Sequence, residues 1–181
     1  MAAHNLLTFI NAEADFAAAR IVLFGAPFDA TASFRTGSRF APNAIRSDSW
    51  ALECYSPYQE RDLSEIAVCD LGDLELAHGN AAAMVAAVRG QAEQIFTAKK
   101  IPFLLGGEHL VSLGAVQAAA KAYPDLLLLH LDAHADLRDE YLGEKLSHAT
   151  VIRRCHDILG DGRIFQLGIR SGDQSEFMWS G

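Results

Sequence analysis

The sequence predicts an α/β fold in which helices cover a mainly parallel β-sheet on both faces, giving three layers. The first observation is that short apolar runs alternate with stretches of helical spacing, and the second is that turn residues separate them. Half of the 181 residues are hydrophobic, which is enough for the core of one domain spanning residues 1–181. The runs predicted as buried strands are 21–24, 66–71, 101–105, 126–131 and 163–167.

Helix signals fill the intervals between these strands. Pro42 suits the first residue of a helix that continues over 43–52, Asn80 can cap the next helix, and Gly160 can end the last one. Apolar residues recur at helical spacing over 84–96, 110–120 and 151–159. Residues 25–41 form the one long loop, and such loops often serve a site. In a parallel sheet, ligands bind at the carboxyl ends of the strands.

Composition excludes several classes of function. Lys and Arg total 15 against 23 for Asp and Glu, so the net charge of −8 disfavours nucleic acid and suits a cationic partner. No apolar run approaches the roughly 20 residues of a membrane span, and residues 1–20 lack the pattern of a signal peptide. The 3 cysteines fit free thiols in a reducing cytoplasm better than a disulfide framework or a zinc site. We therefore expect a cytoplasmic protein without nucleic-acid or membrane partners.

The most informative stretch is LLLLHLDAHAD at 126–136. If the chain stays extended beyond the strand, Asp132, His134 and Asp136 project to the same side. Burying two carboxylates and an imidazole there is costly unless a cation neutralises them. These ligand types suit Mn, Fe, Ni or Zn, and the lack of thiolate argues against a structural zinc site. The alternative is a solvated loop with incidental Asp and His.

A second motif, Gly106-Gly107-Glu108-His109, follows the strand 101–105. Paired glycines permit a tight turn or a close backbone approach, which places His109 at the same sheet edge. The alternative is an ordinary strand-to-helix turn.

Two further histidines are candidates. His148, in Ser-His-Ala before the helix 151–159, could transfer protons or simply begin that helix. His130 shares a strand face with Asp132, where a satisfied core imidazole is favoured over a supporting role beside a ligand.

Together these motifs resemble the ureohydrolases, the arginase and agmatinase superfamily. The resemblance runs in the family's order from about Gly25 to Gly172 and implies an arginase-like fold, a homo-oligomer and hydrolysis of a linear guanidino compound. The residues that carry it are Gly-Gly-Glu-His109, Leu-Asp132-Ala-His134-Ala-Asp136, Ser-His148-Ala, and Ser33 to Phe40 with Ala-Ile-Arg46.

The resemblance also implies a role for each site residue. His109, Asp132 and Asp136 would bind one Mn²⁺, and Asp132 and His134 a second, so that each active site holds two. A hydroxide bridging the ions would attack the guanidinium carbon. Asp136 would also accept a proton from the nucleophile, and His148 would relay a proton to the leaving amine.

Residues after Asp136 indicate the substrate. The run Leu137-Arg-Asp-Glu-Tyr141 and the loop Ser33-Phe-Arg35 resemble agmatinases and differ from arginases. The expected reaction converts agmatine, a small cationic guanidino compound, to urea and putrescine, a step in polyamine biosynthesis. Guanidinobutyrate or another guanidino acid is the alternative substrate. Structural ion pairing is the alternative role for Arg35 and Arg39.

One departure from the family is a missing segment. Ureohydrolases take two further aspartates from a later D-x-D-x-x-D segment, and none occurs before Gly181. We therefore expect the domain to be incomplete at its C-terminus, to lack the strands that join its two halves, and to be inactive alone. The alternative is a truncated homologue that acts only with a missing segment or a partner. A metallophosphoesterase is disfavoured, because its later G-D-x-x-D and G-N-H motifs are absent.

Overall fold

The computed structural model describes residues 7–179. Residues 1–6, the start of the segment that lacks a signal-peptide pattern, lie outside the described residues. Residues 180–181, at the end of the predicted domain, lie outside them too.

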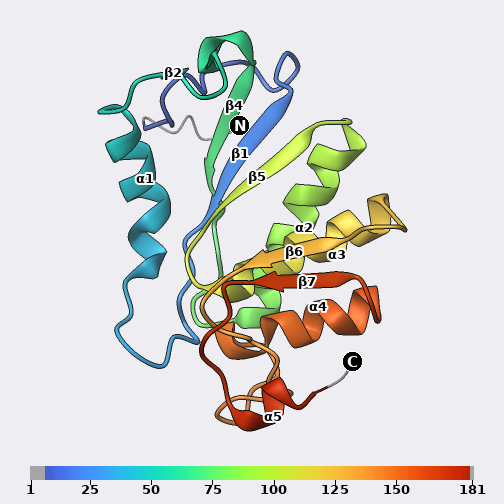
Figure 1. Cartoon of the computed structure of the whole chain (residues 1–181). Coiled ribbons are helices and arrows are strands. Elements are labelled where there is room, and N and C mark those ends of the chain that lie inside the picture. Colours follow the sequence, from blue (N-terminus) through green and yellow to red (C-terminus); the bar gives the residue numbers. More distant parts are fainter. Residues whose placement is uncertain (1–6, 180–181) are drawn as a thin grey trace.

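All five predicted strands are present, as Figure 1 shows. The order β4-β1-β5 forms one parallel part of the sheet, and β6-β7 forms a second parallel part. Within residues 7–179 no ladder joins β5 to β6, in agreement with the expectation of missing strands between the two halves. A short antiparallel hairpin, β2–β3, was not predicted. The strands are β1 (Ile21–Ala26), β2 (Tyr55–Ser56), β3 (Arg61–Asp62), β4 (Val68–Asp73), β5 (Ile101–Gly106), β6 (Leu128–Leu131) and β7 (Ile164–Leu167).

The helix signals are confirmed where they were strongest. Pro42 lies in the first turn of its helix, the Asn80 side chain accepts a hydrogen bond from the Ala83 amide at 2.9 Å, and Gly160 ends its helix at φ 81°. No helix within residues 7–179 has both the length and the apolar character needed to cross a membrane. The helices are α1 (Ala41–Ser49), α2 (Ala81–Thr97), α3 (Ser112–Ala122), α4 (Val151–Leu159) and α5 (Gln174–Phe177), with single 3₁₀ turns η1 (Ser38–Phe40), η2 (Leu63–Glu65), η3 (His109–Val111) and η4 (His148–Thr150).

The main core lies between the sheet and the row of helices α2, α3 and α4. Val22 and Phe24 of β1 point into it and are fully buried, whereas Leu23 points to the other face and packs in a smaller cluster with Val68 and Leu105. This alternation follows from the two-residue period of a strand. One face of the parallel sheet is therefore covered by helices, as predicted.

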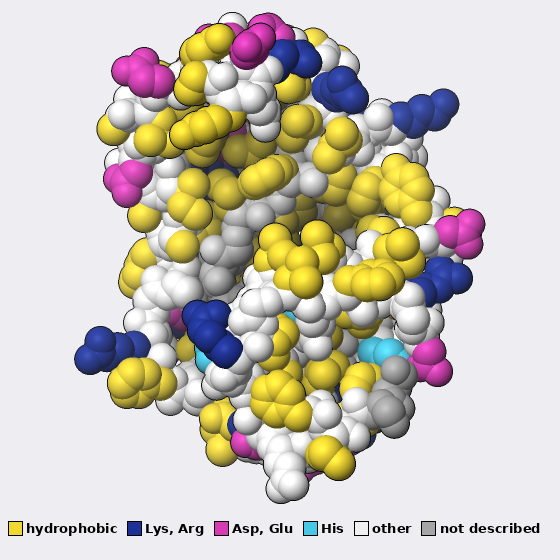
Figure 2. Space-filling model, in the orientation of Figure 1, with side chains coloured by type: hydrophobic (Ala, Val, Ile, Leu, Met, Phe, Trp, Pro, Cys, Tyr) yellow, Lys and Arg dark blue, Asp and Glu magenta, His cyan; other side chains and the backbone are white. Residues whose placement is uncertain are grey.

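The second face is covered less completely than in a sheet with helices on both faces, as expected for an incomplete domain. Side chains of β6 and β7 that point away from α4 are more than half exposed, and Figure 2 shows hydrophobic side chains gathered over β5, β6 and β7. Within the described part of the chain, no helix covers them. These side chains are Leu129, Leu131, Phe165 and Leu167.

A buried ion pair attaches α1 to β4. The Arg46 guanidinium donates to both carboxylate oxygens of Asp70, at 2.8 and 3.0 Å, and to Asp73 at 2.5 Å. The Arg46 and Asp70 side chains are inaccessible to solvent. Burial lowers the pKa of Arg46, but the two carboxylates outweigh it and hold that pKa above its ordinary value. Gly25 is required beside them, because a Cβ there would lie 1.9 Å from Asp73 Oδ1.

We expect Arg46→Met to lower the free energy of unfolding by about 3–5 kcal/mol, because it leaves buried carboxylates without a cation. Urea denaturation measures this change. Arg61→Met is the matched control, since Arg61 pairs with Glu65 on an exposed surface and should change stability by less than about 1 kcal/mol. Equal effects of the two substitutions would contradict the assignment of Arg46 as a buried anchor.

Candidate active site

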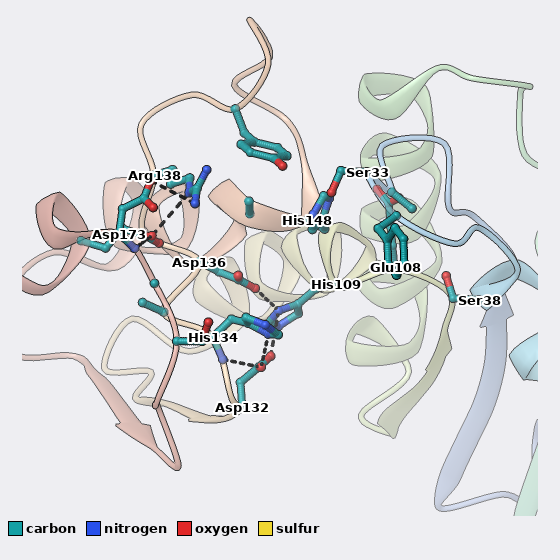
Figure 3. Close-up of a pocket in the computed structure, with 18 of the residues that line it drawn as sticks. Ser33, Ser38, Glu108, His109, Asp132, His134, Asp136, Arg138, His148 and Asp173 are labelled. Carbon is teal, nitrogen blue, oxygen red and sulfur yellow. Dashed lines mark hydrogen bonds and ion pairs between the residues drawn. The ribbon is translucent and has the colours of Figure 1, made fainter.

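The carboxyl ends of β5 and β6 border a cavity of about 620 Å³. His109 follows β5, Asp132 follows β6, and His148 begins the turn that leads into α4. All three line this cavity together with His134 and Asp136, and Figure 3 shows their arrangement. The predicted site residues therefore share one cavity, at the strand ends where a parallel sheet places ligands.

Three of the predicted ligands converge most closely. His109 Nδ1 lies 2.7 Å from Asp136 Oδ2 and 3.3 Å from Asp132 Oδ2. Together with His130, their ligand atoms all lie within 4.8 Å of one another. Two carboxylates this close to each other repel unless a cation or a proton intervenes. Nitrogen and oxygen donors without thiolate fit a divalent metal such as Mn²⁺, Fe²⁺ or Zn²⁺.

His134 is placed differently from these residues. Its side chain is 65% exposed, and its Nδ1 lies 3.5 Å from Asp132 Oδ1. Its backbone amide donates to that same oxygen at 2.9 Å. His134 thus contacts Asp132 but lies outside the group of converging ligand atoms.

The expectation of an extended chain through 132–136 is wrong. β6 ends at Leu131, and Asp136 adopts the left-handed backbone conformation with φ 52°. Its carbonyl accepts hydrogen bonds from the amides of Ile152, at 3.0 Å, and Arg153, at 3.2 Å, in the first turn of α4. These bonds hold a conformation that a residue other than glycine rarely adopts. The Asp136 carboxylate therefore contacts His109 from a turn, and not from an extended strand.

The prediction of a close backbone approach at the paired glycines is confirmed. A Cβ on Gly107 would lie 2.1 Å from the Phe28 carbonyl oxygen. That oxygen accepts a hydrogen bond from the Glu108 amide at 2.8 Å. Glycine therefore allows the loop after β1 to pack directly against the segment that carries His109.

His130 is buried, as expected for a core imidazole, but it also contacts Asp132. The Gln166 side-chain nitrogen donates to the Ala135 carbonyl at 2.9 Å and lies 2.9 Å from His130 Nδ1. Because a carbonyl only accepts, this nitrogen is an NH₂ donor, and His130 Nδ1 must accept from it. The ring proton then sits on Nε2, 3.3 Å from Asp132 Oδ2. Burial lowers the pKa of His130, which agrees with a neutral ring.

Asp132 is held as a carboxylate. Burial raises its pKa, but the His134 amide and the His109 and His130 rings outweigh burial and keep that pKa below its ordinary value. Asp132 is therefore in the ionised form that a metal ligand requires.

His148 is joined to residues that were not predicted as site residues. Its amide donates to Thr31 Oγ1 at 3.1 Å, and Thr31 in turn contacts the buried Glu108 carboxylate. Burial raises the pKa of Glu108, while the hydrogen bonds from Thr31 oppose that shift. The Tyr141 ring meets the His148 ring edge-on, with 5.6 Å between centroids. The only sequence signal for Thr31 was its position in the long loop 25–41.

The two loop arginines, Arg35 and Arg39, differ in their contacts. Arg39 Nε donates to the buried Asp29 at 2.5 Å, and this bond holds the pKa of Asp29 below its ordinary value. Arg39 therefore makes a structural ion pair. Arg35 lines the cavity, with its guanidinium 5.3 Å from the centre of the Phe34 ring.

Arg138 also lines the cavity. Its guanidinium lies 3.0 Å from Asp173 Oδ2, 3.4 Å from Glu176 Oε2 and 4.7 Å from the centre of the Tyr141 ring. Glu176 is buried and also accepts a hydrogen bond from the Leu137 amide at 2.9 Å. Sequence reasoning did not identify the two acidic residues, which lie 35 or more positions after Arg138.

Comparisons with known proteins agree with this architecture. The chain is 44% identical over 178 residues to an agmatinase of Bacillus cereus, covering 98% of this chain and 61% of the relative. A guanidinobutyrase of Pseudomonas aeruginosa is 31% identical over 179 residues, covering 96% of this chain and 56% of the relative. The crystal structure of agmatine ureohydrolase from Thermoplasma volcanium superposes with a TM-score of 0.88 at 39% identity, covering 96% of this chain and 58% of that one.

The chain thus spans less than two thirds of the length of each of these relatives. The sequence model of the arginase family matches residues 19–180, nearly the whole chain. With the arginase fold and these relatives, the match shows that this chain belongs to the arginase family.

Proposed function

We propose that this chain carries part of the active site of a metal-dependent guanidino hydrolase whose reaction converts agmatine to putrescine and urea. The observation that supports it most is the convergence of His109, Asp132 and Asp136 on the wall of a cavity that also holds His148. Membership of the arginase family supports hydrolysis of a guanidino compound. A cytoplasmic location and a homo-oligomeric assembly belong to the same proposal.

The proposed cofactor is a pair of manganese ions. His109, Asp132 and Asp136 would hold one ion, and Asp132 and His134 would contribute to the second. When bound, the metals supply a Lewis acid that lowers the pKa of water and so provides a nucleophile at neutral pH. The neutral Nε2–H tautomer of His130 favours a supporting role, because that nitrogen donates toward Asp132 and its lone pair is not available to a metal.

The protein side chains move the protons. The Asp136 carboxylate would accept a proton from the attacking water as the bond to the guanidinium carbon forms. His148, on another wall of the same cavity, would give a proton to the departing amine nitrogen, so that the amine leaves neutral. Asp136 and His148 are therefore the catalytic residues of this proposal.

The charges around Arg138 favour a cationic substrate over a guanidino acid. Asp173 and Glu176 both contact the Arg138 guanidinium, so that cation is already compensated and is poorly placed to bind a carboxylate tail. The cavity lining holds two arginines and five acidic residues. An amine tail such as that of agmatine suits this balance.

Metal binding can be tested without any turnover. Calorimetric titration of Mn²⁺ into the chain should show binding that His109→Ala weakens by more than about a hundredfold, since it removes a ligand outright. His156→Ala is the matched control, because that ring pairs with Asp161 at 2.7 Å and does not line the cavity. If both variants bound Mn²⁺ as the unmodified chain does, the assigned ligands would be incorrect.

Hydrolysis is tested by measuring urea from agmatine and Mn²⁺. We expect urea from a version extended to the length of the relatives and none from residues 1–181 alone. In the extended version, His148→Gln should lower kcat by about 10²–10⁴-fold with metal affinity unchanged, because only proton transfer is lost. Turnover by residues 1–181 would contradict the incompleteness, and no turnover by either version would contradict the function.

Substrate preference is tested by Asp173→Asn in the version that turns over. Asn keeps the helix-capping ability of Asp173 but frees part of the Arg138 charge. The ratio of kcat/KM for agmatine over 4-guanidinobutyrate should fall by about threefold to fivefold, the size expected for one partly exposed ion pair. Asp125→Asn, at a fully exposed position, is the charge-matched control. An unchanged ratio would show that Arg138 and Asp173 do not set the preference.

A further inference from the structure

We propose that Thr31, held by the buried Glu108 carboxylate, sets the tautomer of His148 with its proton on Nδ1, leaving Nε2 to exchange protons with the cavity. Thr31 would thus be a positioning residue for the proton transfer assigned to His148. This inference rests on the proposed function for its catalytic meaning, but the tautomer itself can be measured independently.

The direction of the hydrogen bonds begins at Glu108. Glu108 is buried, with only 6% of the residue exposed. One carboxylate oxygen accepts a hydrogen bond from the Thr31 amide at 2.9 Å, and the other accepts from the Thr31 hydroxyl at 2.5 Å. Both Glu108 oxygens accept from Thr31, so the single hydroxyl proton of Thr31 points at Glu108. Thr31 Oγ1 is then left with lone pairs alone for its other neighbours.

Both of those neighbours belong to His148. The His148 amide donates to Thr31 Oγ1 at 3.1 Å, which places the residue, and His148 Nδ1 lies 3.5 Å from the same oxygen. An unprotonated Nδ1 would face an oxygen lone pair, whereas a protonated Nδ1 faces it as a donor. At 3.5 Å the contact is long and holds the ring weakly, but its polarity still favours the proton on Nδ1.

The consequence appears at the other ring nitrogen. In a neutral imidazole only one nitrogen carries a proton, so Nε2 has a free lone pair. Figure 3 shows His148 beside the cavity, across from His109 and Asp136, with Glu108 and Ser33 on its far side. Nε2 is therefore the atom that can pick up a proton and later deliver it to a leaving amine.

His130 provides an opposite case within the same molecule. Its Nδ1 accepts from Gln166, which requires the proton on Nε2. The two histidines should therefore show opposite tautomers, each set by a neighbour whose donor or acceptor role is determined by its own partner. One measurement reports on both.

The experiment is ¹⁵N NMR of the histidine rings in ¹⁵N-histidine-labelled protein, comparing the unmodified chain with Thr31→Val and Thr31→Ser. We expect Nδ1–H for His148 and Nε2–H for His130 in the unmodified chain. Thr31→Val should lower the Nδ1–H to Nε2–H ratio of His148 by about twofold to fivefold, the loss expected for one long hydrogen bond. Thr31→Ser, which keeps the hydroxyl, should restore the ratio.

The His130 signals show whether each variant is folded. An Nε2–H tautomer of His148 in the unmodified chain overturns the inference, even if Thr31→Val fails to fold. An unchanged His148 ratio in folded Thr31→Val, with His130 also unchanged, overturns it as well.

Kinetics separates this inference from the proposed function. In a version that hydrolyses agmatine, Thr31→Val should lower kcat by up to about fivefold, because the reactive tautomer becomes less populated, with KM within about twofold, and Thr31→Ser should recover most of the loss. If the NMR result holds but no version releases urea, the function fails and the tautomer assignment stands. If urea is released but His148 carries its proton on Nε2, the tautomer assignment alone fails.

Discussion

The two hydrogen bonds from the first turn of α4 to the Asp136 carbonyl are the contact on which the candidate site depends. They hold Asp136 in the left-handed conformation, whose strain of about 1–3 kcal/mol must be offset locally. In that conformation the Asp136 carboxylate contacts His109. Because the same helix is preceded by His148, its position also determines where that imidazole meets the cavity. One helix start thus links a candidate ligand to a candidate proton donor.

The fold neutralises its acidic residues in two different ways. At β4, Asp70 and Asp73 are matched by Arg46, and the pair is permanently satisfied. At the cavity, within residues 7–179, the carboxylates of Asp132 and Asp136 form ion pairs only with histidines and have no lysine or arginine nitrogen within 4.0 Å. Carboxylates without a permanent cation keep their negative charge available. This difference is the electrostatic argument for placing a metal at the second cluster and not at the first.

Much of the fold could be predicted because its signals are local. The strand that begins at Ile21, the helix start at Pro42 and the cap at Asn80 depend on residues close together in the chain. The convergence of His109 with Asp132 and Asp136 could be expected, since the ends of parallel strands meet at one edge. The extended path could not continue through Asp136, because the first turn of α4 binds the Asp136 carbonyl and the chain turns there. The bare outer face of β6 and β7 likewise depends on what packs there.

The sequence by itself determined the fold class, the order of the elements, the motif residues and the resemblance to the ureohydrolases. Period, caps and motifs are relations among neighbours, and these survive without knowledge of packing. Tertiary structure alone decided which donor faces which acceptor. Thr31 meets Glu108 across 77 positions and His148 across 117. Gln166 reaches His130 across 36. Such contacts arise only when separate segments pack together, so proton positions in the cavity follow from the folded chain and from no local pattern.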